Sequence, residues 1–125
     1  MYEWGGANPD GTRGFEKNRP GWPMPIHDLL VKNHVTIFFH GHDHFYAKQD
    51  LDGIVYQLVP QPACPVGRTA NGARYGYAKG VIKPSSGYLR VKVMPSQVHV
   101  QYVQSGNDSA GAAREAHSYQ LQTRP

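Results

Sequence analysis

A short apolar run, VTIFF at residues 35–39, constrains the fold more than any other feature, because it ends directly in a cluster of histidines. The run is β-branched and aromatic and does not alternate, which is typical of a strand covered on both faces. Just before it, Ile26, Leu29 and Leu30 have the spacing of one helical face, so we predict a helix over residues 25–33. A helix, a short connection and a buried strand together indicate a layered α/β fold.

Most of the remaining chain has the pattern of hairpins joined by loops. Residues 45–49 and 54–59 flank a turn that contains Gly53, which is a hairpin signal. Residues 88–94 and 97–103 alternate apolar and polar positions and predict a second hairpin. We expect one buried side on that hairpin, formed by Leu89, Val91, Val93, Val98 and Val100.

Length and composition set broad limits on the domain and its partners. The 125 residues fit one domain, and the single cysteine allows no internal disulfide. A net charge of +4 is compatible with anionic partners but is too small to choose among them. No apolar run approaches the roughly 18 residues that span a membrane, so we expect no membrane partner. The sequence does not indicate a cellular compartment.

The cluster within FFHGHDHF supplies donor groups for a metal ion. Neutral imidazole is a common ligand of transition metals. In extended backbone, residues two apart project to the same side about 6.6 Å apart, so His42 and His44 could share one ion or each bind one ion of a pair. Gly41 would let the chain turn sharply, and Asp43 would point away or support the ligands. We consider three roles for His40: a third ligand, an outer-shell group, or an ordinary histidine at a strand end.

The segment FFHGHDHFYAKQ resembles the last motif, G-H-x-H, of the calcineurin-like metallophosphoesterases. The resemblance implies an α/β/β/α sandwich with two divalent ions, which could be Mn, Fe, Zn or Ni. It implies that His42 and His44 each bind one ion and that neither is the nucleophile, so we predict no catalytic residue in this chain. His40 stands where the family often has a small residue, and we keep His40 and Asp43 as possible second-shell groups. The implied substrate is a phosphate ester.

Other motifs of that family are missing from the sequence. D-x-H, G-D and N-H-D/E do not occur, and Asn33-His34 is followed by Val35 where an acid is expected. We therefore expect residues 1–104 to be the C-terminal part of a phosphoesterase domain, inactive without the upstream part, and residues 105–125 to be a flexible polar tail. The alternative is a non-catalytic, β-rich binding module with a single metal ion or none.

Residues 60–86 are rich in proline and glycine and are expected to form a long loop. Basic and aromatic side chains alternate there, and together such groups can hold a phosphate and stack on a base. The predicted substrate contacts are Arg68, Arg74, Tyr75 and Tyr77. A solvated loop without function is the alternative, and nucleic-acid binding through this loop is a further, less favoured one.

The remaining candidate ligands are expected to have no role in the site. His27 and His34 belong to the predicted helix and its end, and His99 alternates outward in a hairpin, so we expect all three to face solvent. Cys64 has no neighbour that would lower the pKa of its thiol, so we do not expect it to be catalytic.

Overall fold

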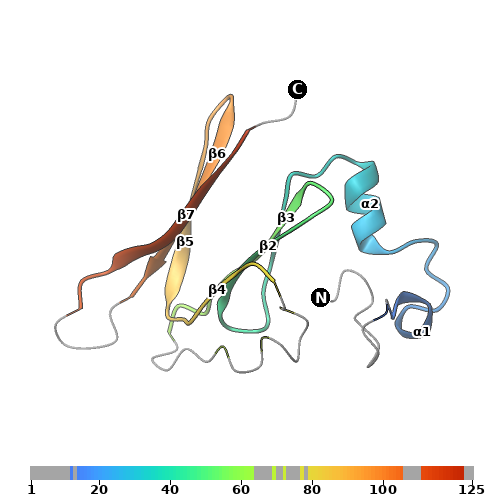
Figure 1. Ribbon diagram of the computed structural model, residues 1–125, viewed down its shortest axis with the longest axis horizontal. Coiled ribbons are helices and arrows are strands. Elements are labelled where there is room, and N and C mark those ends of the chain that lie inside the picture. The colour runs from blue at the N-terminus through green and yellow to red at the C-terminus, as the bar shows by residue number, and fades with distance from the viewer. Residues whose placement is uncertain are drawn as a thin grey trace.

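The computed structural model describes residues 12, 14–63, 69, 72, 77, 79–105 and 111–122, which form two β-sheets and two short helices (Figure 1). The first sheet has the order β1-β3-β2-β4 and the second the order β5-β6-β7. The elements are α1 (Phe15–Asn18), α2 (Ile26–Lys32), β1 (Ile37–His40), β2 (Tyr46–Leu51), β3 (Ile54–Leu58), β4 (Val81–Lys83), β5 (Gly87–Val93), β6 (Gln97–Gln104) and β7 (Arg114–Gln122). The expected α/β class, mostly strands and hairpins, is confirmed at this level.

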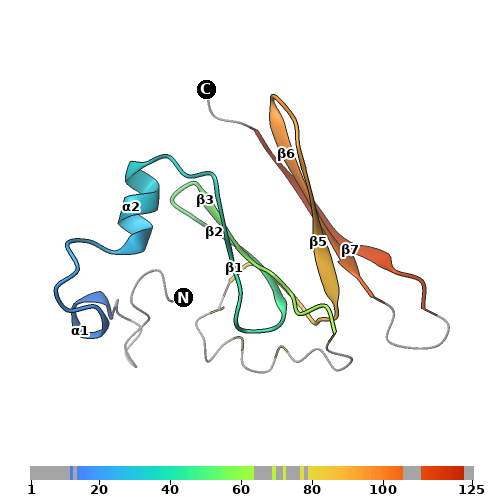
Figure 2. The ribbon, with the colours of Figure 1, turned by 180° about the vertical axis from the view of Figure 1, so that it is seen from behind.

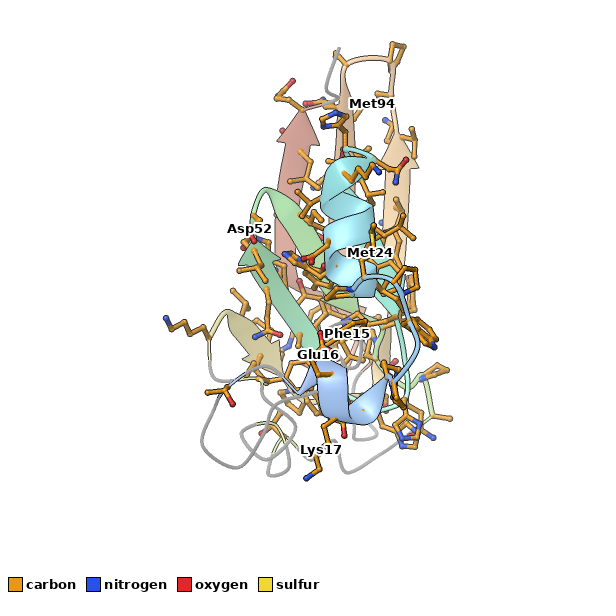
Figure 3. The ribbon with its side chains drawn as sticks, turned by 90° about the vertical axis from the view of Figure 1, so that its right-hand side faces the viewer. Phe15, Glu16, Lys17, Met24, Asp52 and Met94 are labelled. Carbon is orange, nitrogen blue, oxygen red and sulfur yellow. The ribbon has the colours of Figure 1, made fainter. Side chains whose placement is uncertain are left out.

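The described elements lie in three layers. Helix α2 covers one face of the first sheet and the second sheet covers the other, as Figures 1 and 2 show from opposite sides. Figure 3 looks through the same layers, with α2 in front and the second sheet at the back. No helix in the described ranges is long and apolar enough to cross a membrane.

In the first sheet, strand β1 pairs in parallel with β3, and β2 and β3 form an antiparallel hairpin. The hairpin predicted from residues 45–59 is therefore confirmed. Its turn places Asp52 at φ 48° and Gly53 at φ 76°. Two successive positive φ values are typical of the turns that match the twist of hairpin strands, and glycine and aspartate tolerate them well.

Helix α2 forms where it was predicted, but it buries a different face. Asn33 ends the helix, and both its backbone N–H and its side-chain amide donate to the Leu29 carbonyl. Leu29, expected in the buried stripe, is 47% exposed. The buried residue is instead His27, which is 1% exposed, so the expectation that His27 faces solvent is wrong. Ile26 and Leu30 remain partly buried, so the packing face is shifted from Leu29 toward His27, because the polar partners of His27 lie on the sheet.

Strand β1 is covered less completely than its apolar sequence predicts. Phe38 lies on the helix side of the sheet, with its ring 6.0 Å from that of Tyr56. Phe39 points to the other side and is 41% exposed. The prediction of a strand buried on both faces is therefore wrong for one face, because Phe39 faces an open groove between the two sheets.

The second sheet begins with the hairpin of β5 and β6, as predicted. Val91 pairs with Val100 and Val93 with Val98, so these four side chains share one face. Val100 is fully buried, but Val91 is exposed and Val93 is 73% exposed. The expected buried side is thus wrong for Val91 and Val93, because the tip of the hairpin extends past the first sheet (Figure 1).

Two strands form where the sequence predicted loop or tail. The short strand β4 pairs with β2 within the segment 60–86. Strand β7 pairs with β6 along its length, so the expectation of a flexible tail over 105–125 is wrong for residues 114–122. Its composition is polar, but His117 and Tyr119 alternate onto the face that meets the first sheet.

Hydrogen-bonded aromatic side chains join the two sheets. The ring of Tyr46 on β2 stacks on that of Tyr102 on β6, with centroids 4.6 Å apart. The Tyr46 hydroxyl lies 2.7 Å from Nδ1 of His117, and the Tyr119 hydroxyl donates to Oε1 of Gln57 at 2.9 Å. Tyr46, Tyr102 and Gln57 are fully buried. Because buried polar groups need partners, these contacts define how the two sheets meet.

Candidate metal centre

The histidine cluster forms a tight turn at the carboxyl end of β1. His40 is the last residue of the strand, and its carbonyl accepts the Val59 N–H at 2.7 Å. The chain then takes left-handed conformations at His42, with φ 97°, and at His44, with φ 65°. The motif is therefore not extended, and the expected projection of both imidazoles from one side of a strand is wrong. Gly41 is not at positive φ, so the turn is made by the two histidines rather than by the glycine.

The turn separates its side chains between solvent and protein. His42 and His44 are exposed, whereas Asp43 between them is half-buried. The carboxylate of Asp43 faces inward, and its Oδ2 accepts the Tyr77 hydroxyl at 2.6 Å. The backbone carbonyl of His44 is also held, because it accepts the hydroxyl of Ser85. Left-handed backbone costs a residue other than glycine about 1–3 kcal/mol, so surrounding contacts must maintain this conformation.

His40 lies on the protein side of the turn, within a stack of rings. Its ring is nearly parallel to that of Tyr77, with centroids 6.4 Å apart, and also stacks on Phe38 at 6.1 Å. It therefore shares Tyr77 as a neighbour with Asp43. The assignment of His40 and Asp43 to the second shell of a metal remains a prediction.

The predicted substrate contacts are only partly within the described residues. Arg68, Arg74 and Tyr75 lie outside them. Tyr77 lies within them and is 3% exposed, with its ring packed edge-on against Phe45 at 5.1 Å. The sequence singled out Tyr77 as a substrate contact, whereas the structure gives it a partner in the motif itself.

The donors present are the right kind for a metal ion but too few to enclose one. Imidazole suits Zn, Fe and Ni, and His42 and His44 are accessible. However, no group of three or more His, Cys, Asp or Glu side chains is arranged to hold a metal ion in the part of the chain that the structure describes. Catalytic zinc sites take three protein ligands. The described chain therefore supplies two candidate ligands and not a complete coordination shell.

His117, a half-buried histidine where the two sheets meet, was not predicted from the sequence. Burial lowers the pKa of its imidazole, and the nearby positive charges of Lys83 and Lys48 lower it further. The neutral ring is thereby favoured, and its Nδ1 can accept the hydroxyl of Tyr46. The signal for this contact is the alternation of residues 117, 119 and 121 within a polar segment. His117 joins the sheets and is no part of the cluster after β1.

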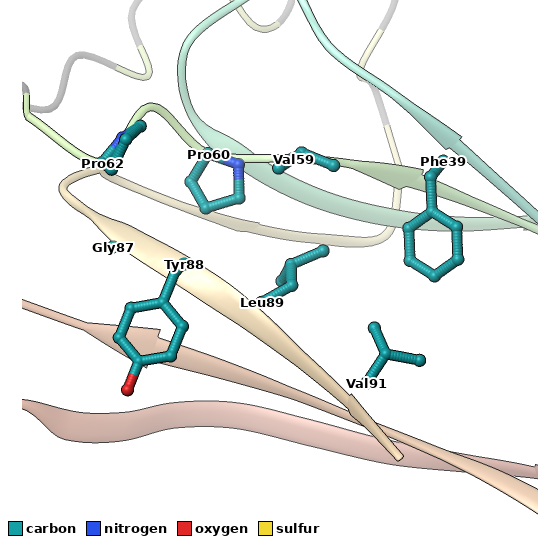
Figure 4. Close-up of a pocket in the computed structure, with 8 residues that line it drawn as sticks. All are labelled: Phe39, Val59, Pro60, Pro62, Gly87, Tyr88, Leu89 and Val91. Carbon is teal, nitrogen blue, oxygen red and sulfur yellow. The ribbon is translucent and has the colours of Figure 1, made fainter. Parts of the chain in front are cut away.

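An apolar groove of about 450 Å³ lies between the two sheets (Figure 4). Phe39 from β1 and Leu89 and Val91 from β5 face each other across it, and Val59 and Pro60 form its rim. Among the described residues that line it, none is acidic, basic or a histidine. The groove is thus a gap in the packing between the sheets and does not contain the predicted metal ligands.

No protein-family model matches this chain, and no curated protein matches it.

Proposed function

We propose that this chain supplies His42 and His44 as two ligands of a divalent-metal centre that hydrolyses phosphate esters. The proposal assigns the chain to the C-terminal part of a calcineurin-like metallophosphoesterase domain. The complete centre would contain two ions, one for each histidine. The other ligands would come from the upstream part of the same domain.

The geometry of the turn is the observation that carries the proposal. Two imidazoles are exposed on either side of an inward-facing carboxylate, directly after a strand that pairs in parallel with its neighbour. Ligands of α/β proteins commonly bind beyond the carboxyl ends of parallel strands. A Cβ on Gly41 would meet nothing within 4 Å, so the approach to the turn is open on that side.

The unpaired edge of the first sheet supports the proposal that a further strand pairs with β1. Among the described strands, β1 has a neighbour only on the side of β3. Edge strands are usually protected by lysine, proline or a bulge, and β1 is IFFH, with none of these. The exposed ring of Phe39, on β1 itself, adds apolar surface beside this edge. A further strand paired with β1 would cover it.

The roles of the residues follow from their chemistry. When bound, two divalent ions would activate a water molecule for attack on phosphorus and stabilise charge on the phosphoryl oxygens. His42 and His44 would bind through neutral imidazole nitrogens and would transfer no proton. Asp43 faces away from solvent and would act only by holding the turn.

A non-catalytic β-rich binding module is the second candidate. The observation that favours it is the small number of metal donors brought together in the described residues. A module of this kind would bind one ion weakly through the two histidines, or none. The two candidates differ in whether a partner strand and further ligands exist.

Cobalt binding to the purified 125-residue chain tests the ligand assignment. We expect weak binding of Co²⁺, measured by calorimetry and by its visible absorption, that falls by about tenfold or more in His42→Ala and in His44→Ala. His34→Asn is the matched control, because His34 is an exposed histidine at positive φ after α2, away from the motif. It should bind Co²⁺ as the unaltered chain does.

Phosphatase assays on the same samples test whether the chain needs an upstream part. We expect no measurable hydrolysis of p-nitrophenyl phosphate with Mn²⁺, Zn²⁺, Ni²⁺ or Fe²⁺ by this chain. Robust metal-dependent hydrolysis would contradict the need for an upstream part. Metal binding that is unchanged in both histidine variants would exclude the ligand assignment, whatever the activity.

A further inference from the structure

Tyr77 connects the histidine turn to the core of the first sheet. Its ring belongs to a buried cluster with Phe45, Ala47 and Leu58, and it is 3% exposed. Its backbone N–H donates to the Gly72 carbonyl at 2.9 Å. Packing therefore holds the Tyr77 ring in place independently of its hydroxyl group.

The hydroxyl of this fixed ring reaches the centre of the turn. It donates to Oδ2 of Asp43 at 2.6 Å, which is a short hydrogen bond to a charged acceptor. Asp43 lies between the two residues at positive φ, His42 and His44. Because the three residues form one tight turn, an Asp43 side chain that points into the protein leaves the side chains of His42 and His44 pointing to solvent.

We propose that Tyr77 is a positioning residue for the metal ligands, acting through Asp43 to hold the left-handed turn in which His42 and His44 face solvent. The metal part of this inference rests on the proposed function. The conformational part does not, since it concerns the backbone of the metal-free chain. Tyr77 is thus assigned to the support of the ligands instead of to substrate contact.

The ring and the hydroxyl of Tyr77 have separable effects. The ring packs against Phe45 and stacks on His40, and phenylalanine would retain both contacts. The hydroxyl donates the hydrogen bond to Asp43. Tyr77→Phe therefore removes the bond to the turn and leaves the packing in place.

The experiment compares Tyr77→Phe, Asp43→Ala and the double variant of the full chain. Tyr119→Phe is the matched control, because it also removes one tyrosine hydroxyl bond, to Gln57, but on the side of the sheet that faces β7. The first readout is the intraresidue amide–α-proton NOE of His42 and His44 in metal-free protein, which is strong at positive φ. The second is the affinity for Co²⁺ alone.

We expect the strong NOEs in the unaltered chain and in Tyr119→Phe, and weakened NOEs in Tyr77→Phe and Asp43→Ala. Affinity for Co²⁺ should fall about tenfold in each of these two variants. The double variant should lose no more than either single variant, because both changes break the same bond. A merely structural role for Tyr77 would lower the melting temperature without this pattern.

Each failure has its own signature. Unchanged NOEs in a folded Tyr77→Phe would overturn the positioning role. Changed NOEs with no Co²⁺ binding in any protein, the unaltered chain included, would keep the positioning role and reject the proposed metal function. Equal losses of affinity in Tyr77→Phe and Tyr119→Phe would also overturn the inference, because the effect would then be general loss of stability.

Discussion

A single buried histidine, His27, connects α2 to the hairpin beneath it. Its Nδ1 lies 2.6 Å from the Tyr56 hydroxyl, and its Nε2 lies 2.9 Å from Oδ2 of Asp52. Asp52 belongs to the β2–β3 turn, which lies beside α2 in Figure 3. The imidazole thus satisfies one buried tyrosine and one carboxylate, and it anchors a helix of seven residues whose other apolar side chains are partly exposed.

We expect His27→Ala to lower the free energy of unfolding by about 2–4 kcal/mol, because it removes both hydrogen bonds and leaves a cavity under α2. Urea unfolding followed by circular dichroism measures the change. His34→Asn, at an exposed position, should change it by less than about 0.5 kcal/mol. If the two variants were equally stable, His27 would not be the anchor of the helix.

At the scale of elements, β1 determines how the first sheet can grow. It is short, parallel to β3 and apolar on both faces, and it carries the histidine turn at its end. Such a strand is typical of the interior of a parallel sheet, yet among the described strands it lies at the edge. The proposed partner strand would cover the edge and bring further ligands to the same end of the sheet.

Without that partner, we expect the purified chain to self-associate through β1. A lysine at an exposed edge position opposes strand pairing, so Phe39→Lys should shift the chain toward monomer. Light scattering coupled to size exclusion, over a range of concentrations, measures this. Val93→Lys on β5, an edge strand of the other sheet, is the control and should have little effect. An unaltered chain that stays monomeric at high concentration would argue against an uncovered edge.

At the scale of the whole molecule, the two sheets meet through tyrosines and a histidine as well as through aliphatic side chains. Burial raises the pKa of the Tyr102 hydroxyl to about 12 and also raises the pKa values of Tyr46 and Tyr119. The pKa of His117 is lowered, chiefly by burial. The interface therefore depends on neutral side chains, and charging any of them opposes the packing of the sheets.

These shifts predict that the free energy of unfolding is highest between pH 6.5 and pH 10.0. The folded state holds the Tyr102 proton more tightly than the unfolded chain, so the free energy of unfolding should fall as pH rises from 10.0 to about 12. It binds the His117 proton more weakly, so stability should also fall as pH drops below 6.5. Urea unfolding at a series of pH values measures both the acid limb, which is the loss of stability below pH 6.5, and the alkaline limb, which is the loss above pH 10.0.

Two variants assign the limbs to their residues. His117→Asn should flatten the acid limb and Tyr102→Phe should reduce the alkaline one, relative to each variant's own stability at pH 8. Tyr88→Phe, at an exposed position, should leave both limbs unchanged. An acid limb that persists in full in His117→Asn would mean that other groups control it.

Local signals predicted the helix, both hairpins and the strand before the histidines. Each depends on residues close together in sequence, such as the Gly53 turn or the stop at Asn33. The buried face of α2 was not predictable in this way, because the partners of His27 lie 25 and 29 residues away. Strand β7 was not predicted for a similar reason. Its polar segment forms a strand because it pairs with β6 and packs side chains against the first sheet, and the contacts with the first sheet are distant in sequence.

For the candidate site, the sequence alone determined which donors are present, since FFHGHDHF places two imidazoles around a carboxylate after an apolar strand. Only the tertiary structure decided their directions. The left-handed turn points His42 and His44 outward and Asp43 toward Tyr77, a residue 34 positions further along the chain. Spacing in sequence specifies which side chains are neighbours, but their orientation depends on backbone angles that distant packing contacts hold in place.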